Sequence, residues 1–153
     1  MKMLNTLLFF LVIIACDSND NSTRPVDRFA DVTKVEVNGS PGAYLFAVTI
    51  LSPDTGCNQY ADWWEVLSED GELLHRRILA HSHVDEQPFT RSGSSIDITE
   101  TRLVYVRAHM NNAGYGGQVM KGTVKGVLDT SLVTDDFASV VANLEPLPTV
   151  CAF

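Results

Sequence analysis

Hydrophobic and polar positions alternate along most of this chain in short runs that are typical of β-strands. Alternation with a period of two places apolar side chains on one face of a strand and polar side chains on the other. Turn residues separate the runs, and the predicted strands cover residues 32–38, 43–52, 62–68, 73–80, 94–99, 102–110 and 118–127. The pattern therefore predicts an all-β domain of about seven strands.

One tight turn predicts how two of these strands pair. Asp70-Gly71 stands between two alternating runs, and this dipeptide is the strongest short hairpin signal. Several short antiparallel strands joined by such turns favour a β-sandwich of immunoglobulin or fibronectin type III kind. Residues 103–108 also resemble the penultimate strand of a fibronectin type III domain, and Trp63 or Trp64 could fill the place of a buried core Trp. This resemblance implies a fold and no particular ligand.

Near the C-terminus the hydrophobic spacing changes to that of a short helix. Apolar residues recur at helical spacing after a capping residue and before two prolines. These positions are Phe137, Val140, Val141 and Leu144, after Thr134 or Asp135 and before Pro146 and Pro148. We expect a sandwich over residues 32–128 and a tail over 129–153 whose short helix packs on it.

The N-terminus carries an apolar run at 4–15 after a single Lys, which has the length of a signal-peptide core and is too short to span a bilayer. The last three residues of this run and the next one form Ile13-Ile14-Ala15-Cys16, which resembles the lipobox of bacterial lipoproteins. The resemblance implies that residues 1–15 are cleaved, that Cys16 is lipidated, and that the protein is anchored in the bacterial cell envelope on its periplasmic or surface side. An ordinary secretory signal is the alternative. The polar residues that follow, up to 31, read as a tether.

Composition and charge limit the classes of molecule that this protein can bind. The 153 residues suit one domain, and 11 Lys and Arg against 19 Asp and Glu give a formal net charge of -8. Because binding a polyanion requires clustered basic residues, nucleic acid is excluded as a partner. The membrane, reached through the lipid anchor, is the expected partner, together with another envelope protein or a small ligand.

The two remaining cysteines, Cys57 and Cys151, fit an oxidising compartment and predict a disulfide bond. Two buried free thiols are one alternative. A metal site is another, although no CxxC spacing supports it.

The densest polar stretch of the chain predicts its binding chemistry. In an extended segment His81 and His83 point to the same side, and His109 could reach the same end of a sandwich. With Asp85 or Glu86 these imidazoles would suit copper or zinc, either in a metal-binding protein or in a metalloenzyme with redox or hydrolytic activity. A copper-zinc superoxide dismutase also carries His-x-His on a sandwich, but the four His of this chain are too few for the two-metal set of that enzyme.

The alternative for the same stretch is an ordered loop without a metal. In it Arg91 would pair with Asp85 or Glu86 and Phe89 would lie buried beneath, and the loop could still be a binding surface.

The other motifs of the sequence give weaker indications of function. Trp63, Trp64 and Tyr115 would offer a stacking platform for glycans if two of the rings are exposed together. Asp54-Thr55-Gly56 matches the aspartic-protease triplet, but its neighbours Pro53 and Cys57 favour a turn. The chain has no GxSxG, HExxH, Walker or EF-hand pattern, so no catalytic residue is predicted.

Three segments together resemble an uncharacterised family of bacterial envelope proteins. They are residues 57–64, 81–91 and 114–117. The resemblance spans most of the folded part and implies a single domain, with no activity attached. The sequence thus predicts a lipid-anchored envelope protein whose β-sandwich acts by binding.

Overall fold

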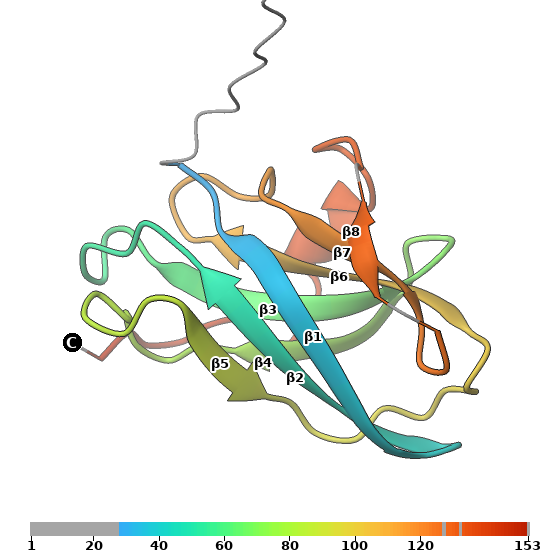
Figure 1. Cartoon of the computed structure of the whole chain (residues 1–153). Coiled ribbons are helices and arrows are strands. Elements are labelled where there is room, and N and C mark those ends of the chain that lie inside the picture. The colour runs from blue at the N-terminus through green and yellow to red at the C-terminus, as the bar shows by residue number, and fades with distance from the viewer. Residues whose placement is uncertain (1–27, 127, 132, 153) are drawn as a thin grey trace, which may run out of the picture.

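The computed structural model describes residues 28–126, 128–131 and 133–152. Two antiparallel sheets pack face to face (Figure 1). The three-stranded sheet has the order β1-β2-β5, from β1 (Asp31–Ser40), β2 (Ala43–Leu51) and β5 (Phe89–Ser92). The five-stranded sheet has the order β4-β3-β6-β7-β8, from β4 (Leu73–Ile78), β3 (Ala61–Ser68), β6 (Leu103–Met110), β7 (Val119–Thr123) and β8 (Asp129–Ser131).

The predicted β-sandwich is confirmed by this arrangement. The fourth strand lies beside the third in the larger sheet. In a constant-type immunoglobulin domain it lies instead with the first, second and fifth strands. The turn predicted at Asp70-Gly71 joins β3 to β4, and Gly71 has a φ of 81°, a conformation that glycine adopts without strain.

The core fills the space between the sheets. Buried and exposed residues alternate along β2 from Ala43 to Phe46, so that Phe46, Val48 and Ile50 point inward. They meet Trp64 and Val66 of β3, all with no exposed surface. Along β2 the alternation read from the sequence therefore reports which face of the strand meets the other sheet.

Strand β3 is buried on both faces, which the sandwich alone does not explain. A second apolar cluster on the outer face contains Leu67, Tyr105, Val119 and Val141, with Phe137 packed against it. Because Phe137 and Val141 belong to the C-terminal segment 133–152, that segment forms a third layer over the larger sheet.

Two buried arginines fix this segment to the sheet. The Glu65 carboxylate accepts hydrogen bonds from Arg76 at 2.7 Å and from Arg107 at 2.8 Å. Both arginines also donate to main-chain oxygens of the C-terminal segment, at residues 137, 138, 141, 144 and 146, and the bond to 141 comes from the same Arg76 nitrogen, Nη2, that bonds Glu65. Hydrogen bonds of this kind, with an ionised donor, are among the stronger ones in proteins. The sequence analysis missed this cluster, although Glu65 and Arg107 stand within strongly hydrophobic strands.

The predicted strand at 94–99 is wrong. The segment that completes the smaller sheet is β5, where Phe89 pairs with Ile50 of β2. Around Ile96 only an isolated bridge to Tyr44 forms. Ile96 and Ile98 are nevertheless buried, each 4% exposed. The alternation there reflects burial of side chains without a continuous ladder of main-chain hydrogen bonds.

The predicted C-terminal helix is shorter than expected and of a different type. It is the 3-10 helix η1 (Ser139–Asn143), preceded by Ala138 with a φ of 48° and no side-chain cap. The carbonyls of Phe137, Ala138 and Val141 accept from Arg107 and Arg76, and those of Ala138 and Val141 also accept the main-chain amides of Val141 and Leu144 within this short turn. Within the described residues no helix is long and apolar enough to span a membrane.

Candidate functional site

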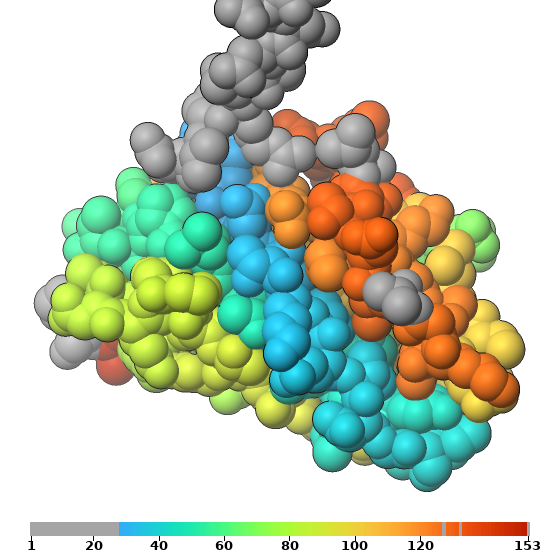
Figure 2. Space-filling model, in the orientation of Figure 1, coloured from blue at the N-terminus to red at the C-terminus, as the bar shows by residue number. Residues whose placement is uncertain are grey.

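The loop with His81 and His83 and the cysteine pair, both singled out by the sequence, lie at one end of the sandwich. Two connections meet there: residues 52–60 after β2, and residues 79–88 between β4 and β5 (Figure 1). They lie side by side in the space-filling view, where residues 52–60 are green and residues 79–88 are yellow-green (Figure 2). The C-terminal residues reach the same end.

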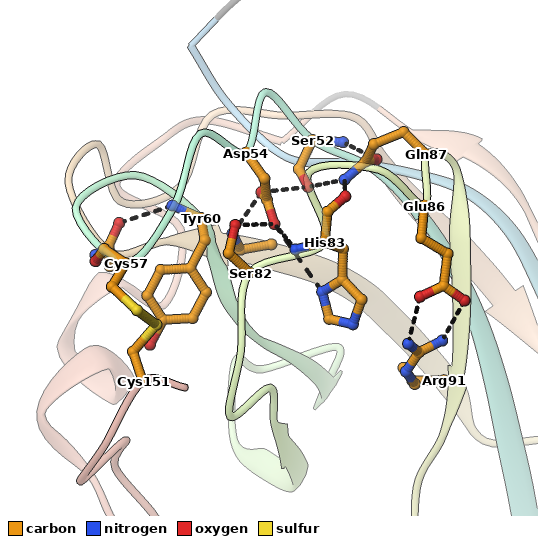
Figure 3. Close-up of polar contacts among 12 residues, drawn as sticks. Ser52, Asp54, Cys57, Tyr60, Ser82, His83, Glu86, Gln87, Arg91 and Cys151 are labelled. Atoms are coloured by element: carbon orange, nitrogen blue, oxygen red, sulfur yellow. Dashed lines mark hydrogen bonds and ion pairs between the residues drawn. A yellow bond between two sulfur atoms is a disulfide. The ribbon is translucent and has the colours of Figure 1, made fainter. Parts of the chain in front are cut away.

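Asp54 holds the two connections together. Its Oδ1 accepts from the Ser52 hydroxyl at 2.7 Å and from the Ala61 amide at 3.0 Å. Its Oδ2 accepts from the His83 amide at 2.8 Å and from the Ser82 hydroxyl at 3.5 Å (Figure 3). A carboxylate buried in this way stabilises both loops because it satisfies donors that burial would otherwise leave unpaired.

Asp54-Thr55-Gly56 is thus a structural element. The Thr55 amide donates to the Gln59 carbonyl at 2.9 Å, and the Gln59 amide donates to the Gly56 carbonyl at 3.0 Å. These bonds form the turn that the neighbouring residues predicted. With its oxygens engaged by loop donors, the Asp54 carboxylate is placed to organise the loops.

Gln87 adds a second link between the loops. Its side-chain oxygen accepts from the Ser52 amide at 2.9 Å, while its nitrogen donates to the Ser52 hydroxyl and to the His83 carbonyl, each at 3.1 Å. The loop from His83 to Gln87 is therefore tied to the end of β2 through both its main chain and its side chains. Such a loop presents its other side chains in a fixed arrangement.

His83 is the most unusual side chain of this end. It is 3% exposed and stacks on Phe89, with ring centroids 3.7 Å apart. Within the described part of the chain neither ring nitrogen has a hydrogen-bond partner, and Asp54 Oδ2 lies 4.0 Å from Nδ1. Burial lowers the pKa of His83, with Arg91 and His81 adding to the effect and Asp54 and Glu86 opposing it. The imidazole is therefore a neutral group with unused hydrogen-bonding capacity.

A cavity of about 460 Å³ opens beside His83. It is lined by His81, Ser82, His83, Val84, Asp85, Glu86 and Ala152. The rings of His81 and His83 lie 4.4 Å apart at a tilt of 37°. His81, Asp85 and Glu86 are exposed, whereas the ring nitrogens of His83 are covered. A ligand would thus meet His81 and the carboxylates first.

Glu86 and Arg91 form the ion pair that the sequence allowed, at 2.7 Å (Figure 3). Hydrogen bonds from Arg91 lower the pKa of Glu86. Phe89 is buried, 1% exposed, as the ordered-loop interpretation required. The pair neutralises one carboxylate at the cavity, and Asp85 remains the other exposed acidic group of its lining.

The C-terminal tail supplies one wall of the cavity. The predicted disulfide is confirmed: Cys57 and Cys151 are bonded, with their Cα atoms 5.7 Å apart (Figure 3). The next residue, Ala152, donates from its amide to the Ala80 carbonyl at 2.8 Å and bridges His81. The disulfide therefore holds the tail where it lines the cavity.

His109 does not join the other two histidines. Its Nδ1 lies 2.7 Å from Oδ1 of Asp62, and its ring stacks on Trp63 at 3.7 Å. Burial raises the pKa of Asp62, against the hydrogen bond from His109, which lowers it. Among the residues that the structure describes, no group of three or more His, Cys, Asp or Glu side chains is arranged to hold a metal ion. The sequence analysis did not single out Asp62.

The expected stacking platform for glycans is not present among the described residues, because its Trp side chains are buried. Trp63 and Trp64 are 4% and 0% exposed, because β3 is covered on both faces. Tyr115 lies against Arg107, 3.5 Å from the guanidinium carbon to the ring centroid. Burial raises the pKa of Tyr115 to about 12. Trp64 belongs to the core between the sheets, and Trp63 and Tyr115 pack edge to face against each other. The three rings of the described structure therefore offer no pair of open faces to a sugar.

One similar protein carries a name that bears on this chain. The chain is 41% identical over 109 residues to a protein of Halomicrobium mukohataei described as "Putative lipoprotein". The match covers 69% of this chain and 53% of that protein, so this chain spans about half of its relative's length. No family model matches the chain, and no solved structure matches it significantly.

Proposed function

We propose that this chain is a lipid-anchored protein of the cell envelope and that its β-sandwich works by binding. Two independent observations support the anchor. The motif Ile13-Ile14-Ala15-Cys16 ends a hydrophobic run of signal-peptide length. The relative that is 41% identical carries the description "Putative lipoprotein". Cys16, the signal and most of the tether lie outside the described residues.

The anchor is tested at Cys16 itself. In cells that express the full chain, Cys16→Ala should abolish lipid incorporation and processing before residue 16, and should release the protein from the membrane fraction. Ser18→Ala, two residues further on, is the matched control and should change nothing. Unaltered processing and membrane association of Cys16→Ala would overturn the proposal.

We assign the ligand site to the cavity beside His81 and His83. The observation that carries this assignment is His83, which is buried with neither ring nitrogen bonded to any residue that the structure describes. Buried polar groups nearly always have a partner, so an unpaired imidazole at a cavity indicates a group that a ligand would satisfy. Glu86 is paired with Arg91, which leaves Asp85 to attract a small cationic ligand.

A transition-metal cation is the specific candidate that the histidine pair favours. Metals bind neutral imidazoles. Burial lowers the pKa of His83 and thereby favours the neutral form of its ring. His81 lies alongside, and Asp85 or Glu86 would complete a mixed nitrogen and oxygen set of the kind that copper and zinc accept. Because the described side chains form no ready cluster of three, binding requires the 81–86 loop to adjust.

Titration of the purified mature chain with Cu(II) and with Zn(II) tests this candidate. Binding should weaken at least tenfold in His81→Ala and remain unchanged in His109→Ala, whose imidazole is held by Asp62 elsewhere. Equal binding by both variants would place any metal outside the cavity. If neither metal binds, an organic cation is tested in the same way. Addition of 1,4-diaminobutane should shift the amide resonances of residues 81–86. Unchanged resonances would contradict the assignment of a ligand site to this cavity.

A further inference from the structure

We infer that the end of the sandwich that carries the cavity faces the membrane and contacts the lipid surface through three exposed apolar side chains. This inference rests on the proposed lipid anchor. It adds an orientation and a partner, the zwitterionic surface of the bilayer in which the anchor is embedded.

The first observation is where the chain enters the domain. The first residue of β1, Asp31, pairs with Leu51, the last residue of β2. At the same end Phe89, the first residue of β5, pairs with Ile50. The chain therefore arrives at the end of the sandwich that carries the connections 52–60 and 79–88, as Figure 1 shows.

The length of chain before β1 limits how far this end lies from the lipid. Fifteen residue steps separate Cys16 from Asp31, a span of at most about 50 Å for any conformation of the chain. A lipid on Cys16 thus holds the domain by its cavity end. The hairpin turn between β1 and β2 lies at the opposite end.

The second observation is the placement of exposed apolar side chains. Six large hydrophobic residues of the described chain are exposed, and three of them lie at the cavity end. They are Leu51 at 42%, Val84 at 41% and Val150 at 68% exposure. The others are Leu45, near the β1–β2 turn, and Val140 and Leu144, in the C-terminal segment.

Each of the three stands next to a residue that is bonded to another segment of this end. Leu51 ends β2, immediately before the Ser52 that bonds to Asp54 and Gln87. Val84 follows His83, whose amide Asp54 holds. Val150 precedes Cys151, which is bonded to Cys57 in the 52–60 connection. Apolar groups fixed on three neighbouring segments suit shallow insertion at a lipid interface, where their removal from water is favourable.

The charges at this end allow such contact with a zwitterionic surface. Glu86 is paired with Arg91, and the Asp54 carboxylate is buried among loop donors. Asp85 and His81 remain exposed at the cavity and would lie at the level of the polar headgroups. The cavity would then open toward the membrane surface.

Fluorescence on vesicles of phosphatidylcholine with brominated acyl chains tests the orientation. The native indoles of Trp63 and Trp64 are buried and give a constant background. In the lipidated protein reconstituted into these vesicles, Val84→Trp should be quenched at least twofold more than Leu45→Trp, the matched probe at the opposite end. Val150→Trp is a second probe and should follow Val84→Trp. Quenching of Leu45→Trp equal to or above that of both cavity-end probes overturns the inference.

Flotation of the same vesicles separates this failure from failure of the anchor. If the protein floats and the probes are quenched alike, the anchor stands and the orientation is wrong. If lipidation does not occur, the Cys16 thiol, left free by the Cys57–Cys151 bond, is coupled to a maleimide lipid. The quenching comparison then decides the orientation without the natural modification.

Discussion

Oδ2 of Asp54 accepts a hydrogen bond from the main-chain amide of His83 at 2.8 Å, across 29 positions of sequence. This contact joins the connection after β2 to the loop that lines the cavity. It makes the geometry of the candidate site depend on a buried residue that does not line the cavity itself.

Asp54→Asn tests that dependence. The replacement keeps the size of the side chain and turns one acceptor oxygen into a nitrogen, so a donor from the set of Ser52, Ala61 and His83 loses its partner. We expect a loss of about 1–3 kcal/mol in the free energy of unfolding, measured by urea denaturation, and faster exchange of the His83 amide proton. Asp85→Asn, an exposed carboxyl beside the cavity, is the control and should leave both unchanged. Unaltered exchange in Asp54→Asn would contradict this account of the loop.

The stability of the protein should fall as the solution is acidified below about pH 6.5, where an unfolded histidine gains its proton. The pKa of His83 is lowered in the folded state by burial, with Arg91 and His81 adding to the effect. Burial lowers the pKa of His75 in the same way. Between the folded and unfolded pKa values the unfolded chain binds more protons, so acidification favours unfolding. Stability conferred by the neutral rings is complete above pH 6.5 and declines below it.

Unfolding free energies at pH 7.5 and 5.5 measure this effect. His83→Gln should reduce the difference between the two pH values, because it removes one of the two groups and leaves His75. A variant that retains the whole difference would show that His83 takes no part in it.

Glu65→Gln should be among the most destabilising single substitutions in the chain. Glu65 has no exposed surface and accepts from both Arg76 and Arg107. Losing its charge would leave two buried guanidinium groups without a counter-charge, and breaking a buried ion pair costs about 3–5 kcal/mol. Chemical denaturation measures the loss, with Glu36→Gln as the control. Glu36 pairs with Lys34 on the surface, and such a pair contributes about 0–1 kcal/mol. Similar losses in the two variants would count against this role of Glu65.

Replacing both Cys57 and Cys151 by Ser should destabilise the domain and release its tail. The bond closes a loop of 94 positions. The chain-entropy treatment gives about 4–5 kcal/mol for a loop of this size, as an upper value. Thermal unfolding should show the loss, and resonances of Ala152 should sharpen as its hydrogen bond to Ala80 breaks. Because Ala152 lines the cavity, ligand binding should weaken in parallel. Tail resonances unchanged by the double substitution would mean that other contacts hold the tail.

Part of this fold can be predicted from local sequence because its causes are local. The strands β2 and β6 and the Asp70-Gly71 turn depend on neighbouring residues, and these predictions are confirmed, with alternating burial along β2 and nearly continuous burial along β6. At 94–99 the same signal misleads, since side chains of Ile96 and Ile98 are buried without a strand ladder. The form of the C-terminal segment could not be predicted in this way, because Arg76 and Arg107, which bond its carbonyls, come from strands far away in sequence.

The sequence by itself determined the all-β class, the cysteine pair and the loop that bears His81 and His83, because strand alternation, cysteine count and residue type are properties of short segments. Only the tertiary structure decided which side chains act together. It separated His109 from the other histidines, buried both Trp residues and made Asp54 the link between two loops. Those outcomes depend on sheet order and on the C-terminal layer, and both are set by contacts between segments far apart in the chain.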